Sequence, residues 1–80
     1  MSNIPADMNA LLTRKATSAA LTDAGFPVAE ASLATMATRG GGPPYRLFGR
    51  KPLYRWADAL EWATGRLSKL FRSTSEAEAA

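Results

Sequence analysis

Five consecutive helix-breaking residues, Gly40-Gly41-Gly42-Pro43-Pro44, lie at the middle of this 80-residue chain and limit what it can form. Glycine destabilises a helix through backbone entropy, and proline lacks the N–H group that a helix interior needs. A helix is therefore expected to end before this run, and a new element to begin after it. Because 80 residues suffice for only one small domain, the run separates elements rather than domains.

The apolar residues are numerous but small. They make up 46% of the chain, yet 16 of them are alanine and only 21 have large side chains. A core built from so few large side chains is thin, and helices that present alanine must approach each other closely. The composition therefore predicts two or three short helices with a small β-hairpin.

The first half of the chain predicts two helices joined by a tight turn. Thr13 is a good N-cap for a helix over residues 14–24, and Gly25 is the natural residue to end it. A second helix is expected over residues 29–38. The expected inner faces are Leu12, Ala16, Ala19, Ala20 and Leu21 for the first helix, and Leu33, Met36 and Ala37 for the second.

The second half predicts a hairpin and a helix. Residues 45–48 and 52–55 are aromatic-rich and flank Gly49-Arg50-Lys51, which is typical of a β-hairpin. Pro52 cannot donate a ladder hydrogen bond, so its strand is expected at the sheet edge. A last helix is expected over residues 56–64. Apolar residues continue at helical spacing to Phe71, but Gly65 weakens a helix, so the residues beyond it either extend the helix or form a separate segment. Periodicity does not decide whether Trp56 or Trp62 lies in the core.

Both ends of the chain have little to bury. We expect residues 1–10 to be a flexible arm, residues 11–67 to be the folded domain, and residues 68–80 to be a tail whose last eight residues are mobile. Residues 1–10 lack the pattern of a secretory signal, and no apolar run approaches the length of a membrane span. The expected location is the cytoplasm, in association with the nucleoid.

Several chemistries are excluded by composition. The chain has no Cys and no His, which removes the usual zinc ligands and the Ser-His and Cys-His nucleophile pairs. Asp58 and Glu61 are spaced i, i+3, but a helix N-terminus and a nearby arginine account for them better than acid–base catalysis does. We therefore expect no enzymatic activity, no cofactor and no metal.

Positive charge is concentrated in one part of the chain. Residues 39–72 contain eight Lys or Arg and two Asp or Glu, a net charge of +6, whereas the whole chain carries +3. Such a concentration is typical of a protein that binds a polyanion such as nucleic acid. The alternative is a solvated basic surface that keeps a small protein soluble.

The order of these elements and four segments resemble the excisionase and MerR-like superfamily of small DNA-binding proteins. The resemblance covers about residues 11–67 and is most specific in the Gly/Pro run and the hairpin. It implies a mainly α fold with a small β-hairpin, a winged helix-turn-helix, in which the second helix enters the major groove and the hairpin is the wing. The segments are Leu11-Leu12-Thr13-Arg14-Lys15, Gly25-Phe26-Pro27-Val28, Gly40-Gly41-Gly42-Pro43-Pro44-Tyr45 and Phe48-Gly49-Arg50-Lys51-Pro52-Leu53-Tyr54-Arg55.

The candidate DNA contacts fall into two groups. Phosphate contacts fix the register of a protein on DNA, and side chains in the groove read the bases. Each group has a plain alternative, namely a solvated charged turn and an exposed helix face. The expected phosphate contacts are Thr13, Lys15, Arg46, Arg50, Lys51 and Arg55. The expected base-reading residues are Glu30, Ala31, Ser32, Thr35 and Arg39.

The resemblance implies an excisionase, or recombination directionality factor, of a prophage or an integrative conjugative element. Such a protein binds adjacent sites on double-stranded DNA, bends the DNA, and directs a tyrosine integrase towards excision of the element. Leu67, Leu70 and Phe71 are candidates for head-to-tail contacts between protomers, or they only extend the last helix. Two alternatives stay open: a transcriptional regulator that binds a promoter, and a protein-interaction module whose hairpin binds an acidic partner.

Overall fold

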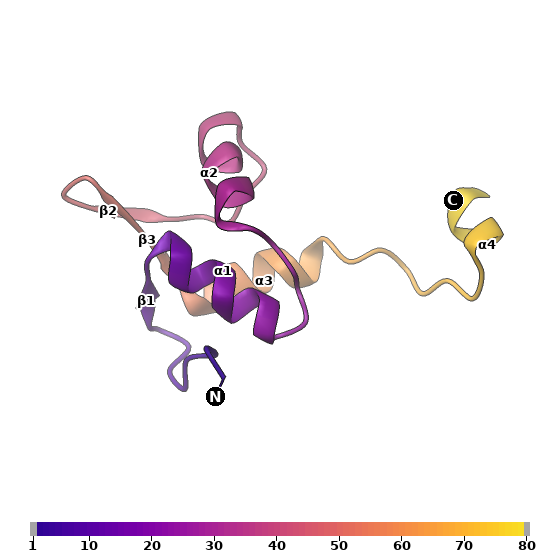
Figure 1. Cartoon of the computed structure of the whole chain (residues 1–80), viewed down its shortest axis with the longest axis horizontal. Coiled ribbons are helices and arrows are strands. Elements are labelled where there is room, and N and C mark those ends of the chain that lie inside the picture. The colour runs from indigo at the N-terminus through magenta and orange to yellow at the C-terminus, as the bar shows by residue number, and fades with distance from the viewer. Residues whose placement is uncertain (1, 80) are drawn as a thin grey trace.

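The computed structural model describes residues 2–79 and shows a mainly helical fold with a small antiparallel sheet (Figure 1). Helices α1 and α3 lie side by side, and α2 packs on α1. The strand order is β1-β3-β2. The elements are β1 (Leu11–Leu12), α1 (Arg14–Asp23), α2 (Glu30–Arg39), β2 (Arg46–Phe48), β3 (Lys51–Arg55), α3 (Trp56–Gly65) and α4 (Thr74–Ala79).

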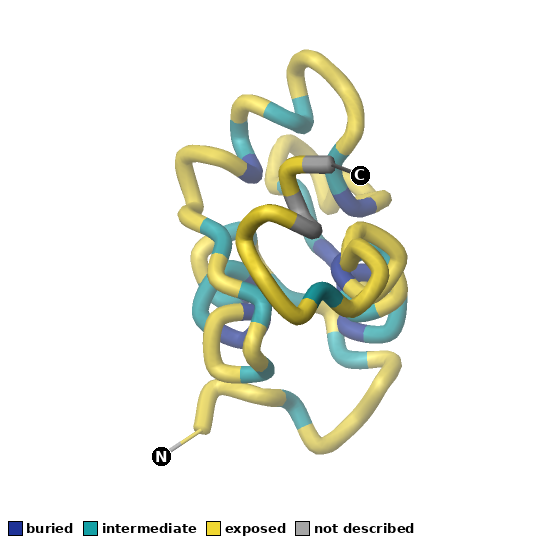
Figure 2. Tube along the Cα trace, turned by 90° about the vertical axis from the view of Figure 1, so that its right-hand side faces the viewer, coloured by how far each residue is buried: buried dark blue, intermediate teal, exposed yellow. Residues whose placement is uncertain are grey.

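The core lies between α1 and α3, where small side chains let the two helices approach. Ala20 and Leu21 of α1 pack with Ala59 and Ala63 of α3, and all four are buried. Trp56 is the largest buried side chain, at 2% exposure, which settles the question of which tryptophan the core contains. Figure 2 shows the buried residues collected inside the body, while most of the tail is exposed.

The first helix begins and ends as predicted, and it buries one polar residue that the apolar pattern did not predict. The Thr13 hydroxyl accepts a hydrogen bond from the Ala16 N–H, and Gly25 follows the helix with a φ of 101°. Thr17 is fully buried, and its hydroxyl donates to the Thr13 carbonyl at 2.8 Å. Burying this hydroxyl is tolerated because it has a hydrogen-bond partner.

The prediction that Pro52 lies in an edge strand is wrong. Strand β3 is the central strand, because Leu11 and Leu12 form a short strand β1 that pairs with Arg55 and Tyr54. Pro52 is tolerated there because β1 does not extend as far as Pro52. On its other side, Pro52 lies opposite Leu47, in the second pair from a two-residue turn. In that pair the N–H groups point away from the partner strand, so the missing donor costs no ladder bond.

The N-terminal segment is attached to the fold rather than separate from it, which differs from the expected flexible arm. No side chain caps α3, whose first N–H groups need partners. The N–H groups of Trp56 and Ala57 donate to the carbonyls of Ala10 and Met8, each at 2.9 Å. Nearer the N-terminus, the Asn3 backbone and side-chain N–H groups both donate to the Asp23 carboxylate.

The C-terminal part confirms the predicted last helix and differs from the prediction in the tail. Helix α3 ends at Gly65 without continuing to Phe71, and residues 66–73 form an irregular segment that leads away from the body (Figure 1). The last eight residues, expected to be mobile, include the short helix α4. Among the described residues, every helix is too short or too polar to cross a membrane.

The Gly/Pro run packs against α2 through Gly42. A Cβ atom on Gly42 would lie 2.8 Å from the Cβ of Met36, so one of the two groups must move. We therefore expect Gly42→Ala to lower the free energy of unfolding by about 1–3 kcal/mol. Urea denaturation followed by circular dichroism measures this change.

Gly65→Ala is the matched control for this substitution. A Cβ on Gly65 meets nothing within 4 Å, and alanine favours the helix by up to about 1 kcal/mol. Equal unfolding midpoints for wild type, Gly42→Ala and Gly65→Ala would contradict the close contact with Met36.

Candidate nucleic-acid interface

The hairpin presents three cations that have no carboxylate partner in the described part of the chain. Strands β2 and β3 are joined by the two residues Gly49 and Arg50, and Gly49 has a φ of 66°, which favours glycine in such a turn. Arg46, Arg50 and Lys51 are exposed, and no described carboxylate lies within 4.0 Å of their charged groups. Their charges are therefore available to a ligand.

Arg55, the fourth hairpin cation, is already hydrogen-bonded within the protein. Its guanidinium donates to the Asn9 amide oxygen at 2.7 and 2.9 Å and to the Asp58 carboxylate at 3.0 Å. The Arg55 and Asp58 side chains are 44% and 37% exposed, so the ion pair is worth at most about 1 kcal/mol. A phosphate can compete for this arginine, but it must displace or share these partners.

The start of α1 contributes a different set of groups. Thr13 uses its hydroxyl oxygen to cap the helix, and Lys15 is exposed. Arg14, which the sequence analysis did not select, donates from Nε to the Tyr54 hydroxyl at 3.0 Å and lies over the Tyr54 ring. This contact links α1 to β3 at the base of the hairpin. The only sequence signal for it was a basic residue beside an N-cap.

The five candidate base-reading residues are all exposed on α2. Ala31 and Thr35 lie on the side away from the buried Leu33, whereas Glu30 lies one turn before Leu33 on the same side of the helix. Most of their side chains are short, which leaves the helix backbone close to any ligand that lies against it. The Thr35 hydroxyl donates to the Ala31 carbonyl at 3.0 Å, so its oxygen remains free to accept. The set is Glu30, Ala31, Ser32, Thr35 and Arg39.

Helix α2 and the hairpin lie on the same side of the molecule. In Figure 1 both stand above α1 and α3, while the N-terminal segment lies below. The loop that joins them is held by the end of α3: the Gly41 carbonyl accepts from Trp62 Nε1 at 2.8 Å and from an Arg66 Nη atom at 3.1 Å. Arg66 also stacks over the Trp62 ring, 5.1 Å from its centroid. The position of the loop between α2 and β2 is thereby set.

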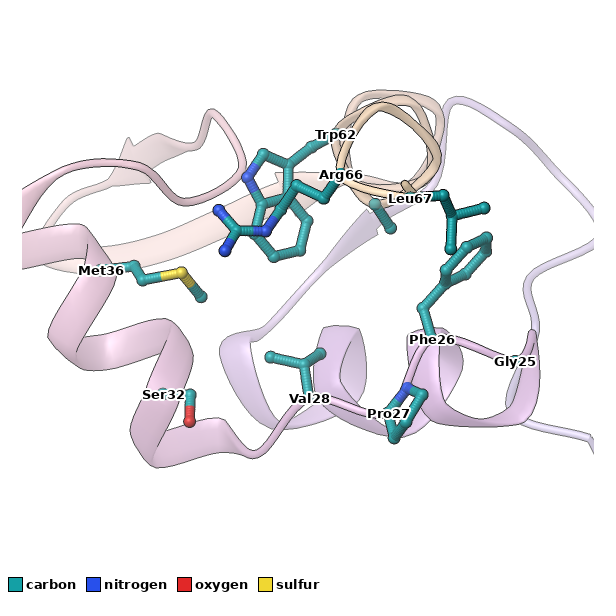
Figure 3. A pocket seen from close by; sticks show the side chains of 10 residues that line it. Gly25, Phe26, Pro27, Val28, Ser32, Met36, Trp62, Arg66 and Leu67 are labelled. Carbon is teal, nitrogen blue, oxygen red and sulfur yellow. The ribbon is translucent and has the colours of Figure 1, made fainter. Parts of the chain in front are cut away.

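The candidate protomer contacts are not brought together. Leu67 lies beside Phe26 at one end of a groove between residues 25–28 and the end of α3 (Figure 3). Leu70 is 88% exposed, whereas Phe71 is half-buried with Lys69 Nζ 5.5 Å from its ring. Leu70 is thus the most accessible apolar side chain of the tail.

The two carboxylates of α3 have separate surroundings. Asp58 pairs with Arg55, while Glu61 is exposed on the next turn. Across residues 2–79 there is no group of three or more Asp or Glu residues that could hold a metal ion.

Comparisons with protein-family models, with curated proteins and with solved structures find no match to the chain.

Releasing Arg55 should strengthen binding to a polyanion. We expect Asp58→Asn to raise the salt concentration at which the protein elutes from a heparin column, because the substitution removes the carboxylate partner of Arg55. Glu61→Gln is the matched control, since it changes the net charge equally on the same helix without freeing an arginine. Equal shifts for the two variants would mean that only net charge matters and that Arg55 is not part of the interface.

Proposed function

We propose that this chain is a sequence-specific DNA-binding and DNA-bending protein with a winged helix-turn-helix fold. In this proposal α2 enters the major groove and the β2–β3 hairpin is the wing. One observation carries it: α2, whose exposed side chains are mostly short, lies on the same side of the molecule as the hairpin, whose three exposed cations have no carboxylate partner among the described residues. Cations hold phosphates, and short side chains let a helix approach base edges.

The proposed contacts divide by chemistry. Arg46, Arg50 and Lys51 contact phosphates, and Arg50 at the turn has the reach to enter a narrow minor groove, where the potential is most negative. Ser32 and Thr35 offer hydroxyl groups to base edges, with Ala31 available for a thymine methyl group. None of these three side chains makes a bidentate contact to a base, so one protomer alone reads little sequence.

We further propose that the protein acts as an excisionase, which directs a tyrosine integrase towards excision of a mobile element. Weak reading by one protomer suits this role, because neighbouring protomers on adjacent sites raise one another's effective concentration. The tail supplies apolar side chains for head-to-tail contacts, with Leu70 the most exposed of them. The protein itself contributes no catalytic step.

Binding to DNA should depend steeply on salt. We expect log K to fall linearly with log[salt], and Arg50→Ala to flatten the slope by about 0.9 because one phosphate contact is lost. Fluorescence anisotropy with a labelled duplex at several salt concentrations measures the slope. Lys69→Ala removes one charge from the tail, far from the hairpin (Figure 1), and should leave the slope unchanged. A wild-type interaction that is independent of salt would rule out the proposed function.

The arrangement of binding sites separates an excisionase from a transcriptional regulator on the same scaffold. We expect footprinting on the DNA that flanks the gene to show tandem sites beside an attachment core, filled in order as protein is added. Leu70→Ser should weaken the filling of later sites more than that of the first. A single palindromic footprint over a promoter would favour the regulator.

A further inference from the structure

Two adjacent apolar side chains are exposed at the end of the hairpin. Phe48 is 75% exposed and Leu47 is 64% exposed, although the chain has few large apolar residues for its core. Phe48 is the last residue of β2 and immediately precedes the turn. The hairpin projects away from the helical body (Figure 1), so a ligand of the hairpin would meet the residues beside its turn.

The strand register sets which residues share a face with Phe48. Phe48 lies opposite Lys51, and Arg46 is two positions before it in the same strand, so the three side chains are on one face. Leu47 and Pro52 are on the other face with Tyr54, which is buried against the body. The Phe48 face is therefore the one opposite the buried Tyr54, and beside the turn it carries an aromatic ring next to two cations.

Phe48 also lacks an aromatic partner within the described part of the chain. Tyr45, the other exposed aromatic residue of this region, packs against Tyr54 with ring centroids 5.6 Å apart. No ring contact of Phe48 occurs among residues 2–79. The ring is free to stack on a ligand without first breaking a contact in the protein.

We propose that Phe48 is a wedge that inserts at a base step of the duplex held by the hairpin. This inference rests on the proposed function and names the residue that bends the DNA. The outer surface of a duplex is polar and charged, and its flat apolar surface lies between base pairs. Apolar side chains inserted there unstack one step and kink the duplex. Arg46 lies about 7 Å from Phe48 along the strand, the rise of about two base pairs, so it can hold a nearby phosphate while the ring inserts.

The mechanism predicts a preference for steps that unstack easily. Pyrimidine–purine steps such as TA kink at the least cost, whereas A-tracts are stiff. The affinity for two duplexes that differ in one such step should therefore differ mainly through Phe48, because the cations contact the same phosphates in both. Leu47, on the opposite face of the hairpin, should have no part in this preference.

The test compares Phe48→Ala with Leu47→Ala on two duplexes of about 30 bp that differ only in a central TA or AA step. End-to-end energy transfer reports the bend, and 2-aminopurine at the step reports unstacking. We expect wild type and Leu47→Ala to bend the TA duplex and to raise 2-aminopurine fluorescence. Phe48→Ala should lose both signals and bind the TA duplex about tenfold more weakly, with an unchanged salt slope.

Phe48→Leu keeps apolar bulk without the ring and should recover part of the bend, and circular dichroism checks that each variant is folded. If wild type binds both duplexes with a steep salt slope but Phe48→Ala bends the TA duplex normally, the wedge is wrong and the proposed function stands. If Phe48→Ala and Leu47→Ala lose the bend equally, the effect is not specific to the ring and the inference also fails. If wild type shows no salt-dependent binding to either duplex, the proposed function itself fails.

Discussion

The carbonyl of Gly41 receives two hydrogen bonds, and the placement of both candidate DNA-contacting elements depends on them. Its donors, Trp62 and Arg66, belong to the end of α3, whereas Gly41 lies in the loop between α2 and β2. A loop of three glycines has many conformations available to it. These two bonds, together with the contact of Gly42 with Met36, select one of them, so α2 and the hairpin keep a defined separation.

A thin core explains much of the remaining architecture. Alanine side chains let α1 and α3 pack closely, and Trp56 fills the volume that they leave. Partly buried side chains such as Leu12 and Leu60 pack around this cluster, and the carbonyls of Met8 and Ala10 accept hydrogen bonds from the start of α3. Phe48 and Leu70 lie outside the core and are exposed, which makes them candidates for contacts with other molecules.

The elements with local signals were predictable from the sequence. Thr13 and Gly25 mark the ends of α1 because a cap and a left-handed glycine are short-range features, and Gly49 marks the hairpin turn for the same reason. Strand β1 was missed because its two residues pair with Tyr54 and Arg55, more than 40 positions away. That pairing also made Pro52 part of a central strand.

The sequence predicted which residues the candidate site contains, but not which of them form hydrogen bonds within the protein. Exposure of Arg46, Arg50 and Lys51 follows from their place in a short hairpin. The Arg55–Asp58 pair is local, at i, i+3, but the engagement of Arg55 by Asn9 depends on where residues 7–10 fold back, which no local pattern encodes. The role of Arg14 was hidden for the same reason, since its partner Tyr54 is 40 residues away.

The junction between β3 and α3 has a mechanical consequence. Arg55 is both the last residue of the strand and the N-cap of the helix, so no linker separates the two. The hairpin is therefore a stiff arm fixed directly to the helix that carries Trp56. A sideways force at the turn is transmitted as a torque on α3 instead of being absorbed by a flexible joint. A rigid hairpin can hold a bound molecule in a bent shape against the elastic force that would straighten it. A flexible loop with the same charges cannot.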